Sequence, residues 1–222
     1  MPDANAAVLL DVDGTLVDSN YLHVLAWARS FAEHGIRDVP MAAIHHCIGM
    51  GSSELLETLI GSAREDVNDG HSRHFAPLRE EIGLLPGARD LLFALSQRGF
   101  RVVLATSAKP EDLDALRRTL DADAVIDHIT SSKDVAAAKP APDLFAVAHQ
   151  AAGLPPERCI AVGDTVWDVR SANGAGVACV CVTTGGISES ELRSAGAAAV
   201  YSGADQLLAR LDESPIGELL RT

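Results

Sequence analysis

The chain has 222 residues, a length typical of one large domain or of one domain that carries an insertion. Apolar residues make up 47% and charged residues 22%, as in ordinary soluble globular proteins. Asp and Glu number 31 against 18 Lys and Arg, which gives a net charge of −13 without any Lys/Arg-rich run. This charge pattern argues against nucleic acids and anionic membrane surfaces as partners.

Neither the first residues of the chain nor its cysteines indicate export. The first residues, MPDANAAVLLDVDG, lack the basic and long apolar regions of a signal peptide, and no apolar stretch approaches the ~18 residues of a membrane span. The four cysteines show neither CxxC spacing nor a disulfide framework. We therefore expect a cytoplasmic protein without a membrane partner, and the sequence leaves monomer and homodimer open.

The first expected elements are one strand and then a long helical block. Residues 7–10 (AVLL) are apolar on both faces, as in a strand buried within a parallel sheet. Residues 19–83 show only helical patterns, with one apolar stripe that ends near Gly35 and another over residues 55–60. A helical block that interrupts the chain after its first strand indicates an inserted α-helical cap domain over residues 19–83.

After Pro86–Gly87 the chain alternates between buried strands and amphipathic helices. Strands are expected over residues 102–106, 159–162 and 178–182, and helices over residues 88–98, 111–120 and 143–152. This alternation predicts an α/β fold, a Rossmann-like three-layer core with a parallel sheet, built from residues 1–18 and 84–222.

Polar side chains follow three of the predicted strands. Asp11 and Asp13 follow the first, Thr106 the second, and Asp164 the third. Because open parallel sheets bind ligands beyond the carboxyl ends of their strands, we expect these side chains to share one edge. Clustered carboxylates repel one another unless a cation joins them, and Mg²⁺ takes oxygen ligands of this kind. The sequence therefore predicts a Mg²⁺ site.

The same residue types suit phosphoryl transfer. An Asp carboxylate such as Asp11 is an established type of nucleophile toward phosphorus. Gly14 allows the chain to bend so that Asp13 reaches the leaving-group oxygen. Thr106 offers a hydrogen bond to a phosphoryl oxygen, and Lys139, in the loop AAAKPAPD, neutralises developing charge.

Four motifs carry a family resemblance. DVDGTLVDS, LATSAK, AKPAPDLF and GDTVWDV match in order the motifs of the haloacid dehalogenase-like superfamily. The resemblance covers the whole chain, the helical cap included, and is strongest to the branch of phosphoglycolate phosphatases and β-phosphoglucomutases.

That resemblance implies roles for the acidic residues. Asp11 would attack phosphorus and form an aspartyl-phosphate, while Asp13 would protonate the leaving oxygen and then activate water. Mg²⁺ would be held by the Asp11 side chain, the Asp13 backbone carbonyl and Asp164. Asp168 would support the water shell of the metal or orient Lys139.

The resemblance also implies how phosphate is bound. Thr106 and Lys139 would bind the phosphoryl group. Backbone amides of residues 12–14, including Gly14, and of Ser107 would hold its oxygens.

The expected cap offers further candidates for substrate contact. His23 and Trp27 lie four residues apart and share a helix face, and His23 matches a substrate-facing histidine of the mutase-like branch. The alternative, a polar cap residue, stays open. Gly49 lies in a loop between cap helices, where it allows either close approach to a ligand or a plain turn. Surface positions are expected for four other histidines: His45, His46, His71 and His74.

The resulting hypothesis is a Mg²⁺-dependent phosphatase that hydrolyses a small phosphorylated metabolite, a phosphomonoester. Gly163 before Asp164, and the cap loop GMGSSE without an Arg, argue against a β-phosphoglucomutase-like mutase, which stays the alternative. The presence of Asp13 argues against dehalogenation. A non-enzymatic phospho-acceptor module is least favoured, because such modules lack a helical insertion after the first strand.

Overall fold

The computed structural model describes residues 5–221, and their side chains except those of residues 110, 111 and 132. A six-stranded parallel sheet runs in the order β5-β4-β1-β6-β7-β8. Its strands are β1 (Ala7–Leu10), β4 (Arg101–Ala105), β5 (His128–Thr130), β6 (Cys159–Gly163), β7 (Ala178–Val182) and β8 (Ala199–Tyr201). The predicted α/β fold with a parallel sheet is confirmed.

The central strand β1 shows why the sheet has helices on both faces. Val8 and Leu10 pack into one apolar cluster, while Ala7 and Leu9 pack into a second cluster on the opposite face. All four side chains are fully buried. Since successive side chains of a strand point to opposite faces, a wholly apolar strand needs a covering layer on each side.

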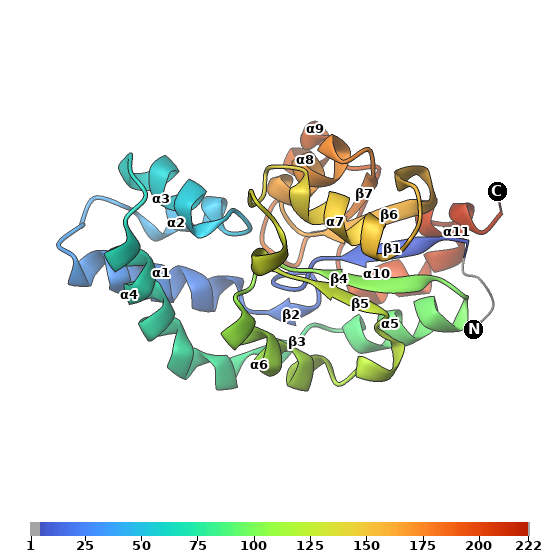
Figure 1. Cartoon of the computed structure of the whole chain (residues 1–222), viewed down its shortest axis with the longest axis horizontal. Coiled ribbons are helices and arrows are strands. Elements are labelled where there is room, and N and C mark those ends of the chain that lie inside the picture. The colour runs from blue at the N-terminus through green and yellow to red at the C-terminus, as the bar shows by residue number, and fades with distance from the viewer. Residues whose placement is uncertain (1–4, 222) are drawn as a thin grey trace.

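Two groups of helices supply these layers (Figure 1). The cluster with Val8 and Leu10 takes residues from α5 (Ala88–Gln97), α6 (Pro110–Leu120), α10 (Ala204–Ala209) and α11 (Pro215–Leu219). The cluster with Ala7 and Leu9 takes residues from α7 (Asp143–Ala151), α8 (Val166–Gly174) and α9 (Glu189–Ala195). Throughout residues 5–221, each helix is too short or too polar to cross a membrane.

Four further helices lie to one side of the sheet (Figure 1). They are α1 (Asn20–Glu33), α2 (Met41–Cys47), α3 (Ser52–Ile60) and α4 (Glu65–Phe75), followed by the 3₁₀ helix η1 (Ala76–Glu81). We call residues 19–82 the helical segment. Its two ends meet where β2 (Val17–Asp18) pairs antiparallel with β3 (Gly83–Leu84). An apolar cluster that includes Trp27, Phe31 and Leu56 is built wholly from residues of this segment.

Short elements escaped the sequence analysis. β5 and β8, at the two edges of the sheet, have three residues each. The remaining 3₁₀ turns are η2 (Asp123–Val125), η3 (Ser132–Asp134), η4 (Pro156–Arg158) and η5 (Leu211–Glu213).

Candidate active site

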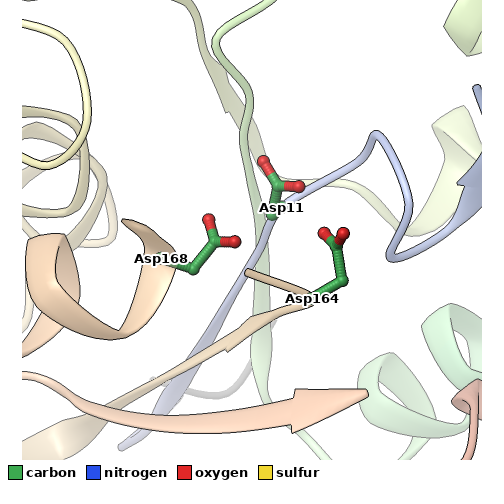
Figure 2. Close-up of side chains that lie close together, drawn as sticks. All are labelled: Asp11, Asp164 and Asp168. Carbon is green, nitrogen blue, oxygen red and sulfur yellow. The ribbon is translucent and has the colours of Figure 1, made fainter. Parts of the chain in front are cut away.

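Three aspartates meet beyond the carboxyl ends of the central strands (Figure 2). Asp11 directly follows β1, Asp164 directly follows β6, and Asp168 lies in the first turn of α8. Each is buried, and one carboxylate oxygen from each lies within 4.8 Å of the others. Parallel pairing of β1 with β6 brings Asp11 to the other two carboxylates although about 150 residues separate it from them in the chain.

A buried lysine lies among these carboxylates. Lys139 Nζ is 2.5 Å from Asp11 Oδ1 and 2.6 Å from Asp168 Oδ1, and the side chain is only 1% exposed. Burial by itself would lower the pKa of Lys139, but the charges of Asp11 and Asp168 outweigh it and raise that pKa. Lys139 is therefore a fixed positive charge at neutral pH.

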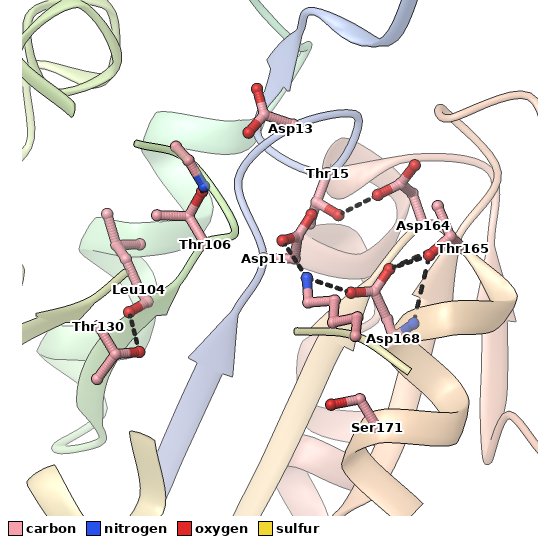
Figure 3. Close-up of polar contacts among 12 residues, drawn as sticks. Asp11, Asp13, Thr15, Leu104, Thr106, Thr130, Asp164, Thr165, Asp168 and Ser171 are labelled. Carbon is pink, nitrogen blue, oxygen red and sulfur yellow. Dashed lines mark hydrogen bonds and ion pairs between the residues drawn. The ribbon is translucent and has the colours of Figure 1, made fainter. Parts of the chain in front are cut away.

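Asp168 is held by the start of its own helix. Its Oδ2 accepts hydrogen bonds from Thr165 N at 3.0 Å and Thr165 Oγ1 at 2.6 Å (Figure 3). Thr165 in turn accepts from Asp168 N, so the two residues form a capping box at the start of α8. With one oxygen in the cap and the other against Lys139, Asp168 is placed to orient the lysine.

Asp164 is fully buried, and each of its two carboxylate oxygens accepts a hydrogen bond. It accepts hydrogen bonds from Thr15 Oγ1 (Figure 3) and from Asn20 Nδ2, each at 2.9 Å. Burial, followed by the charges of Asp168 and Asp11, raises the pKa of Asp164 well above its ordinary value.

The charge balance of this cluster calls for a cation. Asp11, Asp164 and Asp168 bring three carboxylates, and Lys139 supplies one positive charge. The donors are all oxygens, which suits Mg²⁺ better than a thiophilic metal. Burial raises the pKa of Asp11 to about 7, and Lys139 only partly offsets this effect. A divalent ion beside Asp11 would hold its carboxylate ionised.

Asp13 occupies different surroundings. The chain turns after it at Gly14, whose φ of +76° lies in the left-handed region that favours glycine, as the sequence predicted. Ser19 Oγ donates to Asp13 Oδ1 at 2.5 Å, and His23 Nε2 lies 3.6 Å from the same oxygen. Burial raises the pKa of Asp13, but His23 and Ser19 outweigh burial, so that the pKa is lowered.

The residues after β4 lie at the same edge of the sheet. Thr106 is almost fully buried, and its Oγ1 accepts a hydrogen bond from Ala108 N at 3.0 Å. Its own N–H donates to Thr130 O on β5. Ser107, the next residue, lines a cleft that begins at Asp11 and Lys139.

This cleft lies between the sheet and the helical segment and has a volume of about 750 Å³, part of it open to solvent. Asp13, His23 and Gly49 also line it. Gly49 has a φ of +94°, and a Cβ there would come within 2.9 Å of Thr165 Oγ1. The loop after α2 therefore approaches the residue that caps α8 and holds Asp168.

One sequence expectation is wrong: His71 is not on the surface. It is 8% exposed, its ring stacks on Trp27 at 4.2 Å between centroids, and its Nε2 lies 3.2 Å from His23 Nδ1. Burial lowers the pKa of His71 well below its ordinary value, so the ring is neutral. The spacing of Val67, His71 and Phe75, four residues apart along α4, could have indicated a buried face.

Further residues at the site were missed. Ser19 and Asn20, at the start of α1, each contact an aspartate of the site. Lys109 lines the cleft and donates to Ser72 Oγ at 2.6 Å on α4. Asn20 shares a helix face with His23, three residues on, which is the one pattern in the sequence that could have indicated it.

The chain was compared with known proteins. A family model described as haloacid dehalogenase-like hydrolase matches residues 6–176. Protein CbbY of Cereibacter sphaeroides is 30% identical over 224 residues, which cover 91% of this chain and 90% of that protein. Phosphoglycolate phosphatase of Rhodospirillum rubrum is 30% identical over 209 residues, which cover 88% and 86%. The crystal structure of a hydrolase from Pseudomonas syringae has a TM-score of 0.88 at 33% identity, covering 94% of this chain and 98% of that one.

Fold and site define the class: an α/β enzyme whose acidic centre lies beyond the carboxyl ends of β1 and β6. Because the family model matches far more than half of the chain, the chain belongs to the haloacid dehalogenase-like hydrolases. This membership excludes the non-enzymatic phospho-acceptor module.

Proposed function

We propose that the protein is a Mg²⁺-dependent phosphatase that hydrolyses a small phosphomonoester through an aspartyl-phosphate on Asp11. The observation that carries this proposal is the buried contact between Asp11 and Lys139 at one end of the cleft. A carboxylate beside a fixed positive charge suits nucleophilic attack on a dianionic phosphoryl group, whose charge the lysine offsets. The name of the Rhodospirillum relative, a phosphoglycolate phosphatase, supports the same reaction class.

The metal would be held by oxygen atoms of this cluster. We assign the Asp11 side chain, the Asp13 backbone carbonyl and Asp164 as its ligands. When bound, Mg²⁺ would neutralise negative charge on these ligands and on the phosphoryl group. Asp168 is assigned to orient Lys139, because Thr165 holds its Oδ2 while its Oδ1 lies 2.6 Å from Lys139 Nζ.

Side chains of this protein would then carry out two successive displacements at phosphorus. In the first, an Asp11 oxygen attacks phosphorus, the bond from phosphorus to the leaving oxygen breaks, and Asp13 gives that oxygen a proton. In the second, Asp13 takes a proton from water, whose oxygen attacks phosphorus and releases inorganic phosphate from Asp11. Lys139, Thr106 and the backbone amides of Val12, Asp13 and Ser107 would bind the phosphoryl oxygens. The Gly14 amide, which the sequence also suggested, instead donates to Val17 O at 2.8 Å.

The substrate would be selected by an inserted cap, for which we propose the expected bounds of 19–83. Two observations support it: the β2–β3 ribbon brings the ends of the helical segment together, and the segment has an apolar cluster of its own. A cleft partly closed by such a cap favours small phosphorylated metabolites over macromolecules. His23 and Gly49, which line the cleft from this side, are proposed substrate contacts.

Metal dependence is the direct test. Phosphate release from a panel of phosphorylated metabolites should require Mg²⁺ and stop on chelation. Ca²⁺ should inhibit, because its larger and more flexible shell would bind a carboxylate through both oxygens and occupy the nucleophile. Asp164→Ala should weaken Mg²⁺ binding. Full activity after exhaustive chelation, or unchanged Mg²⁺ affinity in Asp164→Ala, would refute the assigned metal role.

A sugar-phosphate mutase is the second candidate, and one observation favours it. Lys109 places a positive charge in the cleft, partly held by Ser72 and Asn68 of α4. That charge could bind the second phosphate of a bisphosphate, which weakens the argument from the missing Arg in the cap loop. Gly163, in place of a second acidic residue, still favours hydrolysis.

A further inference from the structure

Asn20, the first residue of α1, contacts the proposed metal ligand Asp164. It is 3% exposed, and its Nδ2 donates to Asp164 Oδ2 at 2.9 Å. With Asp164 ionised, as a metal ligand would be, its carboxylate can only accept, so the amide nitrogen faces Asp164 and the amide oxygen points elsewhere. Among the residues that the structure describes, that Oδ1 atom is buried without a hydrogen-bond partner, although Asn20 lines the cleft.

The pair of Asn20 and Asp164 is closely packed between two glycines. A Cβ at Gly14 or at Gly185 would collide both with Asn20 Nδ2 and with Asp164 Oδ2. Backbone on two sides therefore leaves the amide and the carboxylate little freedom to turn. This close packing sets Asn20 apart from a polar residue that merely begins a helix.

Neighbouring contacts tie the same part of the helical segment to the site. Ser19, directly before Asn20, donates to Asp13. His45 Nε2, on α2, lies 2.8 Å from the carbonyl oxygen of Gly185, next to the Asn20 amide. The start of the segment thus contacts carboxylates that follow two different strands, β1 and β6.

We propose that Asn20 is a positioning residue of the metal site. Its amide nitrogen fixes the plane of the Asp164 carboxylate, together with Thr15 on the other oxygen. Its unpartnered Oδ1 accepts a hydrogen bond from a water of the Mg²⁺ shell, since Mg²⁺ usually keeps several waters. This inference rests on the proposed metal site and adds to it a contact supplied by the helical segment.

The contact couples two properties of the molecule. Because Asn20 belongs to α1, packing of the helical segment on the sheet and Mg²⁺ binding at Asp164 favour each other. By thermodynamic linkage the coupling is reciprocal. The free energy by which docking of the segment strengthens Mg²⁺ binding equals the free energy by which bound Mg²⁺ strengthens docking.

The test is Mg²⁺ affinity without substrate, measured by titration calorimetry. Asn20→Leu keeps the branching of the side chain but removes both the donor and the acceptor, and Asn20→Ala serves if the leucine variant misfolds. Loss of an outer partner of a metal ligand typically costs ~10–100-fold in affinity, so we expect the dissociation constant to rise at least about tenfold. At saturating Mg²⁺ the KM for the phosphate ester should stay near the wild-type value.

Asn68→Ala is the matched control. Asn68 also lies in the helical segment and also contacts a residue outside it, Lys109 Nζ at 3.4 Å, but it does not line the cleft. Its Mg²⁺ affinity should equal that of the wild type. If Asn20→Leu or Asn20→Ala binds Mg²⁺ as tightly as the wild type does, the role of Asn20 is overturned. If the wild-type protein binds no Mg²⁺, the metal site is overturned as well.

Discussion

Asp11 and Asp13 lie two residues apart, yet their surroundings differ. Asp11 is buried among other carboxylates and has its pKa raised to about 7, whereas His23 and Ser19 hold the pKa of Asp13 down. An ionised Asp13 suits the second displacement, in which it takes a proton from water. For the first displacement it must gain a proton, which an incoming phosphate dianion favours by repulsion between like charges.

The division of labour between the two aspartates can be tested with amide variants. Asp11→Asn should bind substrate but form no aspartyl-phosphate, because an amide is a poor nucleophile. Asp13→Asn should give a burst of nitrophenol from p-nitrophenyl phosphate, whose leaving group needs little protonation, and then turn over ~10²–10⁴-fold more slowly. Stopped-flow absorbance measures the burst.

Mass spectrometry of the quenched Asp13→Asn enzyme locates the phosphoryl group. The adduct should lie on the peptide that contains Asp11. An adduct on Thr106 or Ser107, or an active Asp11→Asn enzyme, would contradict the mechanism.

The same burial of Asp11 affects stability when no metal is present. Unfolded, the Asp11 carboxyl loses its proton near pH 3.8, whereas folded it keeps the proton up to about pH 7. The folded state thus binds more protons in this window, and its stability falls as pH rises through it. That pKa difference corresponds to roughly 4 kcal/mol as an upper bound.

Urea unfolding in EDTA at pH 4.5 and pH 7.5 measures this effect. From pH 4.5 to pH 7.5, the free energy of unfolding should fall by more in the wild-type protein than in Asp11→Asn. Because the charge of Asp11 contributes to the raised pKa of Asp164, the same comparison is made in the Asp164→Asn background, where Asp164 no longer titrates. A difference that does not change with pH would show that the Asp11 carboxyl is ionised throughout.

At the scale of elements, the loop between α2 and α3 acts on the start of α8. Gly49 of this loop lies against Thr165, Thr165 holds Asp168, and Asp168 holds Lys139. A chain of direct contacts therefore runs from the helical segment to the proposed phosphate-binding lysine.

Gly49→Ala should break this arrangement. The new Cβ would push Thr165, and small displacements of catalytic groups cost up to ~10²-fold in rate, so we expect kcat/KM to fall roughly 10–100-fold. Gly35→Ala is the control, because Gly35 also has a positive φ of +75° but has nothing within 4 Å of its Cβ position. Both variants should lose stability because of the positive φ, Gly49→Ala more than Gly35→Ala because of its contact with Thr165, and only Gly49→Ala should lose activity. Equal activity losses would contradict the contact chain.

At the scale of the whole molecule, a net charge of −13 opposes the approach of an anionic substrate. The cleft compensates locally with Lys139 at one end and Lys109 on its wall. Whether hydrolysis or mutase action follows would depend on whether the cleft admits water to the proposed aspartyl-phosphate or holds a second phosphate acceptor in place.

Incubation with β-glucose 1-phosphate and a trace of glucose 1,6-bisphosphate separates the two outcomes. Because Gly163 replaces a second acidic residue, phosphate release should outrun formation of glucose 6-phosphate. The reverse order of rates would make the mutase the better assignment. In that case Lys109→Met should reduce mutase activity more than hydrolysis, because only the mutase must hold a second phosphate.

The sequence by itself determined the features that local patterns encode. Apolar runs identified the four central strands, because a strand buried on both faces must be apolar on both. Motif order gave the family and brought Asp11, Asp13, Lys139 and Asp164 into one hypothesis. The helices of residues 20–75 were recognisable as a block, since no strand pattern interrupts them.

Other features were decided only by tertiary structure. Strands β5 and β8 are too short to carry a pattern, so that pairing with β4 and β7 defines them. The burial of His71 depends on the ring of Trp27, which packs against it from α1, whereas Phe75 lies one turn further along the same helix. Asn20 meets Asp164 across 144 residues of chain, and the raised pKa of Asp11 depends first on burial and then on charges that include the remote Asp168. Such contacts and electric fields exist only once the folded chain has brought remote residues together, and no local pattern records them.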